Sequence, residues 1–416
     1  MISTKQLNTN SNITYIVLSY LLINLMFSCS TKTGNAIEVN EDKRIRLSVD
    51  YQISHQIESN KEIDVLIAFV EEYLNTETYL EMLSFWETSG EEKLTIQIDL
   101  LNSDIKSKYP DFKPTVYAIE VLENNHFLLK IALMGKPEEF YSINSLFNLL
   151  AKYDCENQCF EFINTTNKKL ETKNRFKKNN VIYYSDNEYI SEDETTLSFE
   201  FEKKLASFLS MEIVPYKVVI FNNSKELNRF IGYEYEHSMY LNNSYAGLFI
   251  PYDNFILNAN GSPFYPHEIT HLYTKKKIGI KNNLVDEGFA TFLGGSLGYD
   301  YPYHVNNLKG YVSKHKINLL ESLKEENFYD NLVGISTSFK YSTGAFLCHV
   351  IYKEKGRTGL LDFLETGKTT TDLINNLELI FNLKEEDLEG FLREELVNFK
   401  EKVYPLENNN VSTYMT

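Results

Sequence analysis

Residues 266–272 read Pro-His-Glu-Ile-Thr-His-Leu, and residues 286–290 read Asp-Glu-Gly-Phe-Ala. If the first stretch is helical, His267 and His271 lie one turn apart on the same face. Two imidazole nitrogens placed in this way can bind one zinc ion. The alternative is a surface helix that carries the same residues by chance.

Two glutamates complete the pattern of a catalytic zinc site. Glu268 lies between the histidines and can act as a general base toward water activated by zinc. A catalytic zinc takes three protein ligands and leaves one position open, so Glu287 in the second stretch is the expected third ligand. We therefore predict one Zn²⁺ per chain.

The sequence resembles the gluzincin metallopeptidases, the thermolysin-like and aminopeptidase-N-like group also called peptidase MA. The resemblance rests on HEITH, DEGFA and a third stretch, Tyr-Ser-Thr-Gly-Ala at 341–345, which follow one another in the family order. It covers roughly residues 180–402. The resemblance implies a zinc peptidase that acts on peptide or protein substrates. It implies these roles: ligands His267, His271 and Glu287, general base Glu268, and oxyanion donor Tyr341.

The sequence departs from the aminopeptidases of that family in one respect. No G-A-M-E-N segment, which grips the substrate amino terminus in those enzymes, precedes the HEITH stretch. The resemblance therefore does not carry exopeptidase specificity. It is closer to the peptidase-MA-like lipoproteins of Bacteroidota-type bacteria.

Two other functions fit the same residues. The first is a lipoprotein binding or assembly module that keeps zinc for structure, although such a site has no need of the base Glu268. The second is a zinc amidase that acts on cell-wall peptide. Hydroxamate inhibition and peptidoglycan fragments assayed beside casein distinguish these functions from a protease.

The amino terminus has the pattern of a bacterial lipoprotein signal. An apolar run of about fifteen residues, a length typical of a signal h-region, ends in Met26-Phe27-Ser28-Cys29. We expect residues 1–28 to be the signal peptide, Cys29 to carry the lipid, and residues 29–43 to form a polar tether. The alternatives are an ordinary secretory signal or an uncleaved anchor. The expected location is the cell envelope, on the outer membrane, facing the periplasm.

Composition excludes some partners. The net charge is −17, so the chain has no excess of positive charge to neutralise phosphates or to dock on anionic lipid. We therefore expect no nucleic-acid partner. In an exported chain a Cys155–Cys159 disulfide is one expectation, and two thiols are the alternative.

We expect an α+β fold with two domains. A small N-terminal α+β domain over 44–175 precedes a thermolysin/aminopeptidase-N-like gluzincin domain over 176–404, with a helical C-terminal part and a frayed tail, 405–416. In the first domain we expect strands at 44–54, 92–101, 115–122, 126–134 and 158–163, helices at 62–75 and 142–152, a turn at 123–125, and a polar linker at 164–179.

In the second domain we expect strands at 181–184 and 215–221, two short strands within 245–258, and helices at 193–210, 224–231, from Pro266, from Asn283, 341–355, 359–365 and 385–402. The resemblance to gluzincins implies that the cleft edge that pairs with substrate lies at Gly247, Leu248, Phe249 and Ile250, or at 254–257. The alternative is an ordinary pair of buried strands.

Asp286 has two possible roles in this pattern. We favour an N-terminal cap of the second site helix over the orientation of a ligand histidine. Residues 298–340 are expected to roof the cleft as loop and helix, and their His304 and His315 are interpreted as structural.

Overall fold

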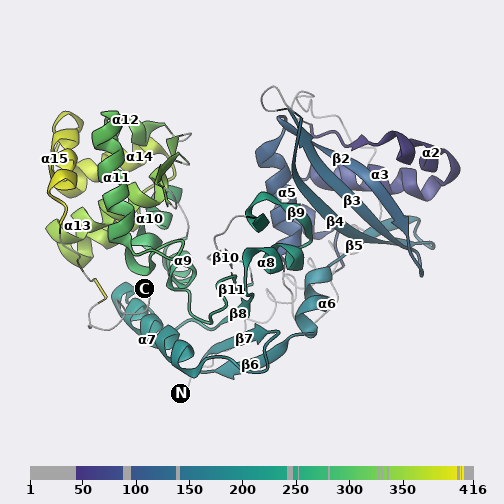
Figure 1. Ribbon diagram of the computed structural model, residues 1–416, viewed down its shortest axis with the longest axis horizontal. Helices are drawn as coiled ribbons and strands as arrows, with labels where there is room; N and C mark the ends of the chain where they lie inside the picture. Colours follow the sequence, from purple (N-terminus) through teal and green to yellow (C-terminus); the bar gives the residue numbers. More distant parts are fainter. Residues whose placement is uncertain are drawn as a thin grey trace, which may run out of the picture. The chain divides into compact units, whose positions relative to one another are not determined.

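The computed structural model describes residues 44–87, 95–136, 141–240, 247–251, 253–279, 282–325, 328–329, 331–334, 337–400, 403 and 405–406. They form two compact units, which divide after Ile163, with residues 95–97 belonging to the second unit (Figure 1). Both units combine helices with open sheets, so the expected mixture of helix and sheet is confirmed. The predicted signal peptide, tether and lipidated Cys29 lie outside the described residues, as does most of the predicted tail.

The first unit packs helices against an open sheet. Its elements are β1 (Ser48–Val49), α2 (Tyr51–Ser59), α3 (Lys61–Leu74), α4 (Tyr79–Leu83), α5 (Ile96–Lys108), β2 (Phe112–Val121), β3 (His126–Gly135), β4 (Ser142–Asp154) and β5 (Cys159–Ile163). Strands β2 to β5 form an antiparallel meander in chain order, and β1 pairs in parallel with β2. Asn124 and Asn125 turn the β2–β3 hairpin with positive φ angles, as the composition of 123–125 predicts.

Three predictions for this unit are wrong. The segment 142–152 is strand β4 rather than a helix, because alternate side chains, such as Phe147 and Leu149, are buried while Leu146 and Leu150 face the half-exposed side of the sheet. Apolar residues on both faces hide the period of two. The segment 92–101, predicted as a strand, is described from residue 95, and helix α5 starts at Ile96.

The apolar residues that mark α5 as a helix extend beyond the segment predicted as a strand. Ile98, Leu101 and Ile105 are buried at helical spacing. The third wrong prediction is the strand at 44–54, of which only Ser48–Val49 is strand. The Asp50 carboxylate accepts from the backbone N–H of Gln52 and so starts helix α2.

The second unit begins with a helix and a five-stranded sheet and ends in helices. Its elements are α6 (Thr165–Glu171), β6 (Asn174–Lys178), β7 (Val181–Ser185), α7 (Glu192–Leu209), β8 (Tyr216–Ile220), α8 (Ser224–Ile231), β9 (Tyr233–Glu236), the 3₁₀ helix η2 (His237–Tyr240), β10 (Gly247–Ile250), β11 (Phe255–Asn258), α9 (Pro266–Lys277), α10 (Asn283–Gly294), α11 (Tyr301–His315), α12 (Leu319–Lys324), β12 (Leu332–Gly334), β13 (Thr337–Ser338), α13 (Phe339–Leu364), α14 (Thr370–Phe381) and α15 (Glu385–Asn398).

The sheet of this unit has the order β10-β11-β8-β7-β6. Its inner pairs, β11 with β8 and β8 with β7, are parallel, and both outer pairs are antiparallel. Helix α9 packs against α7, α10 and β10. One apolar core runs from the sheet through α9 and α10 into the C-terminal helices, with Val218, Leu272, Phe289 and Phe346 among its buried members. The core therefore holds the two motif helices rigidly beside the sheet.

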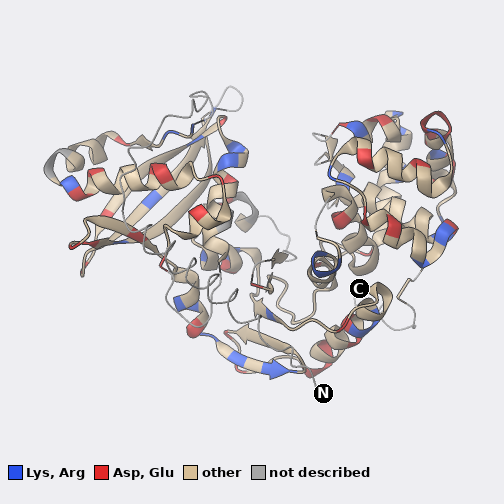
Figure 2. Ribbon diagram, turned by 180° about the vertical axis from the view of Figure 1, so that it is seen from behind, with Lys and Arg blue, Asp and Glu red and all other residues tan. Residues whose placement is uncertain are grey.

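The predicted linker 164–179 is wrong. Its residues form helix α6 and strand β6, which is an outer strand of the sheet and is rich in basic residues (Figure 2). Asn164 starts α6 by accepting from the backbone N–H groups of Thr166 and Asn167. Helix α14 was not predicted, although Thr369 and Asp372 form a capping box at its start.

The other predicted elements of the second unit are confirmed within a few residues at their ends. Gly356, with φ of 60°, interrupts α13 where the predicted helix 341–355 ends. The described part of the region 298–340 contains helices α11 and α12, the short strands β12 and β13, and the start of α13.

Candidate metal centre

Helix α9 carries the first part of the site. Pro266 occupies its first turn, where the missing N–H group is not needed, and Gly279 with φ of 78° follows its end. Residues 266–274 are all buried. His267 and His271 therefore lie in the buried part of α9, and not on an exposed helix that carries histidines by chance.

Helix α10 brings Glu287 to the two histidines. Its start is capped by Asn282, whose side chain accepts from the backbone N–H of Val285. The residue after Glu287 is Gly288, and a Cβ atom there would lie 2.3 Å from the Cα of Gly344 on α13. The glycines of the DEGFA and YSTGA stretches thus touch each other, and this contact lets α10 and α13 approach closely.

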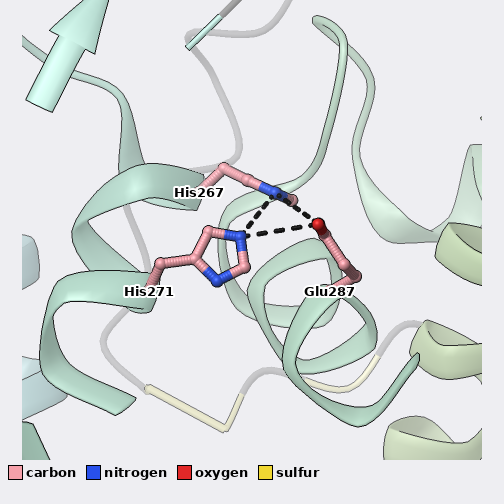
Figure 3. Close-up of side chains that lie close together, drawn as sticks. All are labelled: His267, His271 and Glu287. Atoms are coloured by element: carbon pink, nitrogen blue, oxygen red, sulfur yellow. Dashed lines mark hydrogen bonds and ion pairs between the residues drawn. The ribbon is translucent and has the colours of Figure 1, made fainter. Parts of the chain in front are cut away.

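Three possible metal-binding atoms form a nearly equilateral triangle (Figure 3). The Nε2 atoms of His267 and His271 are 3.1 Å apart, and Oε2 of Glu287 lies 3.3 Å from the first and 3.5 Å from the second. A tetrahedral zinc ion with bonds of about 2.0–2.1 Å holds its donor atoms roughly 3.3 Å apart. The spacing and chemistry of the donor set therefore fit such an ion.

Each histidine is oriented through its other ring nitrogen. Nδ1 of His267 donates to the carbonyl oxygen of Gly295 at 2.7 Å, and Nδ1 of His271 donates to Oδ2 of Asp286 at 2.8 Å. The carbonyl group can only accept, so Nε2 of neutral His267 presents its lone pair to the triangle. The same tautomer of His271 does so as well.

Asp286 orients a histidine instead of capping the helix. Our preferred interpretation as a cap is wrong, because Asn282 is the cap and Asp286 lies inside α10. Its second carboxylate oxygen accepts from the hydroxyl of Thr274 at 2.8 Å. Carboxylates held in this way raise the basicity of a ligand histidine.

The charges of the cluster depend on one another. Burial alone lowers the pKa of His271, but the carboxylates of Asp286 and Glu287 raise it well above its ordinary value. Burial opposes ionisation of Glu287, yet hydrogen bonds from His267 and His271 bring the pKa of Glu287 far below its ordinary value. The carboxylate of Glu287 and the imidazole of His271 thus favour each other's charged forms.

Glu268 lies under the edge of the sheet. Burial raises its pKa, and the backbone N–H of Phe249 on β10 donates to its carboxylate. A Cβ atom at Gly247 would lie 2.1 Å from the ring of Tyr265 and 2.7 Å from Cγ of Glu268. Only glycine permits this approach, so β10 runs directly beside the expected base.

Strand β10 is an outer strand of the described sheet, whereas β11 lies between β10 and β8. Of the two candidate edge segments, Gly247–Ile250 is thus at the edge and 254–257 is inside the sheet. Gly247 and Leu248 are half-buried, and Phe249 and Ile250 are buried.

Tyr341 reaches the same site from α13. Its half-buried ring lies with its centroid 6.0 Å from that of His267, at an interplanar angle of 63°. The ring of Tyr265, the residue before α9, stacks beside that of the same histidine, with 6.2 Å between the ring centroids. Sequence reasoning did not identify Tyr265, Thr274 or the Gly295 carbonyl as neighbours of the site.

Other candidate residues do not belong to the cluster of metal-binding atoms. Cys155 and Cys159 are thiols and form no disulfide, so of our two alternatives the structure has the second. They flank the turn between β4 and β5, in the first unit. His315 is exposed at the end of α11, and His304 is buried within the same helix.

Neither a scan against protein-family models nor a search of curated proteins found a match for this chain. Among the residues that the structure describes, none of the helices combines the length and apolar character that a membrane crossing requires.

Proposed function

We propose that this protein is a zinc-dependent peptidase. One observation carries the proposal: His267, His271 and Glu287 present three donor atoms 3.1–3.5 Å apart, and both histidines are oriented from behind. Two imidazoles and one carboxylate are the donor set of catalytic zinc sites that keep a fourth position open.

The surrounding residues have distinct tasks in this proposal. A bound zinc ion supplies the Lewis acidity that polarises water and a peptide carbonyl. Glu268 takes the proton of the attacking water and passes it to the leaving amine. Tyr341, whose ring lies 6.0 Å from that of His267, donates a hydrogen bond to the developing oxyanion.

The position of β10 supports a peptide substrate. Its residues Gly247–Ile250 form an outer strand beside Glu268, and an extended peptide can add to such a strand through backbone hydrogen bonds. The buried base also supports an enzyme over a binding module, because a structural zinc site gains nothing from a buried carboxylate next to its ligands.

Hydrolysis of a mixed pool of unfolded peptides tests the proposal. We expect cleavage by the zinc-loaded full chain, none after chelation, and recovery when zinc is restored. Glu268→Gln keeps the shape and the zinc but removes the base, so turnover should fall at least about a hundredfold, at the lower limit for loss of general-base catalysis. Glu200→Gln on the exposed part of α7 is the matched control, with unchanged turnover expected. Wild-type turnover in Glu268→Gln would contradict the mechanism.

A further inference from the structure

His304 is a fully buried histidine that belongs to none of the three motifs. It lies in the second turn of α11, which begins at Tyr301. Both of its ring nitrogens have hydrogen-bond partners within the second unit: the carbonyl oxygen of Ser296 and the hydroxyl of Thr337. Each partner belongs to a segment that carries part of the metal centre.

The first partner belongs to the turn that holds His267. Gly295, which accepts from Nδ1 of His267, is followed by a tight turn in which Ser296 and Tyr299 exchange two backbone hydrogen bonds of 2.9 Å. Leu297 and Gly298 at its tip have positive φ angles of 51° and 83°. The left-handed backbone conformation is unfavourable for a leucine, so contacts from outside the turn help to hold it.

His304 gives that support. Its Nε2–H group donates to the carbonyl oxygen of Ser296 at 3.1 Å, one residue beyond the carbonyl that orients His267. The imidazole of His304 therefore has its donor directed at the start of the turn. Movement of the Ser296 carbonyl would move the adjacent Gly295 carbonyl with it.

The second partner belongs to the start of helix α13. Nδ1 of His304 accepts from the hydroxyl of Thr337 at 2.7 Å, and Oγ1 of Thr337 lies 2.8 Å from Oγ of Ser342. Ser338, the N-cap residue of α13, makes no side-chain cap hydrogen bond. The Ser342 hydroxyl donates to the carbonyl oxygen of Ser338 at 2.6 Å and lies 2.8 Å from Thr337, so Ser342 joins Thr337 to the first turn of this helix, immediately beside Tyr341.

We propose that His304 is a positioning residue that holds His267 and Tyr341 in a fixed relation, by bonding the Ser296 turn with one ring nitrogen and the Thr337–Ser342 pair with the other. The part that concerns Tyr341 rests on the proposed peptidase function. A neutral imidazole has one donor and one acceptor, as these two partners require. Burial lowers the pKa of His304 to about 4, which keeps the ring neutral at physiological pH.

Two substitutions separate the two contacts. In His304→Gln the amide nitrogen can replace Nε2 and donate to Ser296, but nothing replaces Nδ1. In His304→Asn the amide oxygen can replace Nδ1 and accept from Thr337, but the side chain is too short for Ser296. Thr337→Val removes the second contact from its other end and should behave like His304→Gln.

The experiment measures zinc affinity by chelator competition and kcat and KM at saturating zinc. We expect His304→Asn to weaken zinc binding about tenfold, as for other residues that orient a ligand, and His304→Gln to keep it within about twofold. His304→Gln and Thr337→Val should instead lower kcat about tenfold with little change in KM, because only Tyr341 is displaced.

His349→Gln is the matched control. His349 is another buried histidine, on α13, and burial also lowers its pKa to about 4. It should lose a similar amount of thermal stability but keep zinc affinity and kcat. Equal zinc affinity in wild type and His304→Asn would overturn the proposal. So would losses of zinc affinity and kcat in His349→Gln that equal those in the His304 variants. If the wild type binds zinc but cleaves no peptide, the proposed function fails, and the zinc affinities alone decide the role of His304.

Discussion

Two carboxylates of the second unit lie against its core, and their pKa values are shifted in opposite directions. Glu287 on α10 faces the imidazoles of His267 and His271, which bring its pKa far below the ordinary value. Glu202 on α7 is fully buried and accepts a hydrogen bond from Tyr216 at 2.7 Å. Burial raises the pKa of Glu202 to about 7, against the weaker opposing effect of its hydrogen bonds.

The difference shows that the neighbouring side chains determine whether a buried acid is ionised and can bind a cation. Hydroxyl groups such as that of Tyr216 can bond a carboxylate but cannot neutralise its charge, so the pKa of Glu202 stays above its ordinary value. Imidazoles can share the charge, and their lone pairs can also join the carboxylate in binding a cation. Helix α9 packs against both helices that carry these acids. Its histidines bond to side chains of α10. Its Tyr273 lies near α7, and burial together with the charge of Glu202 raises the pKa of this tyrosine.

The largest expected effect removes a ligand from the first cluster. His271→Ala should weaken zinc binding by more than about a hundredfold, because losing a ligand exceeds the roughly 10–100-fold effect of losing a residue that orients one. Chelator competition with the purified full chain measures the affinity. His315→Ala, at an exposed position of α11, should bind zinc like the wild type. Full affinity in His271→Ala would remove this histidine from the donor set.

The second effect concerns Glu202 and depends on pH. The ordinary pKa of Glu is about 4.5 and that in the folded protein is about 7, so the folded state binds more protons between these values. The contribution of Glu202 to stability is therefore complete below about pH 4.5 and is lost as pH rises toward and through 7, by roughly 3 kcal/mol in total.

Glu202→Gln should remove this pH dependence, because the amide stays neutral. Thermal melts at pH 5 and pH 8 measure this effect. The quantity to compare is the difference in stability between wild type and variant at each pH. We expect the variant to gain stability relative to wild type at pH 8. The exposed Glu200→Gln is the control on the same helix, with no such change expected. A difference that does not vary with pH would show that Glu202 is ionised throughout.

The smallest effect concerns Asp286. Asp286→Asn keeps an oxygen that can accept from Nδ1 of His271 but removes the negative charge that makes the imidazole a better donor to metal. We expect zinc affinity to fall about tenfold, again measured by chelator competition. Asp193→Asn, exposed in the first turn of α7, should leave it unchanged. No change in Asp286→Asn would mean that the hydrogen bond alone orients His271.

Sequence patterns predicted the second unit better than the first. Helix α9 and the start of α10 carry strong local signals: Pro266 at one start, and a buried run after Asn283. In the first unit, β4 carries apolar residues on both faces, which hide its period of two, so its sequence pattern wrongly predicts a helix. The role of Asp286 was also misjudged, because a residue near a helix start can be a cap or can bond to a neighbouring helix.

The spacing within HEITH and the residue types of DEGFA were enough to predict a metal cluster, because helix geometry alone places His267 and His271 on one face. The tertiary structure decided everything that reaches the cluster from a distance in the chain. The Gly288–Gly344 contact sets how closely α10 and α13 pack, and the turn after α10 brings the Gly295 carbonyl to His267. A backbone carbonyl is present at every residue, so no side-chain pattern distinguishes the one that orients a ligand.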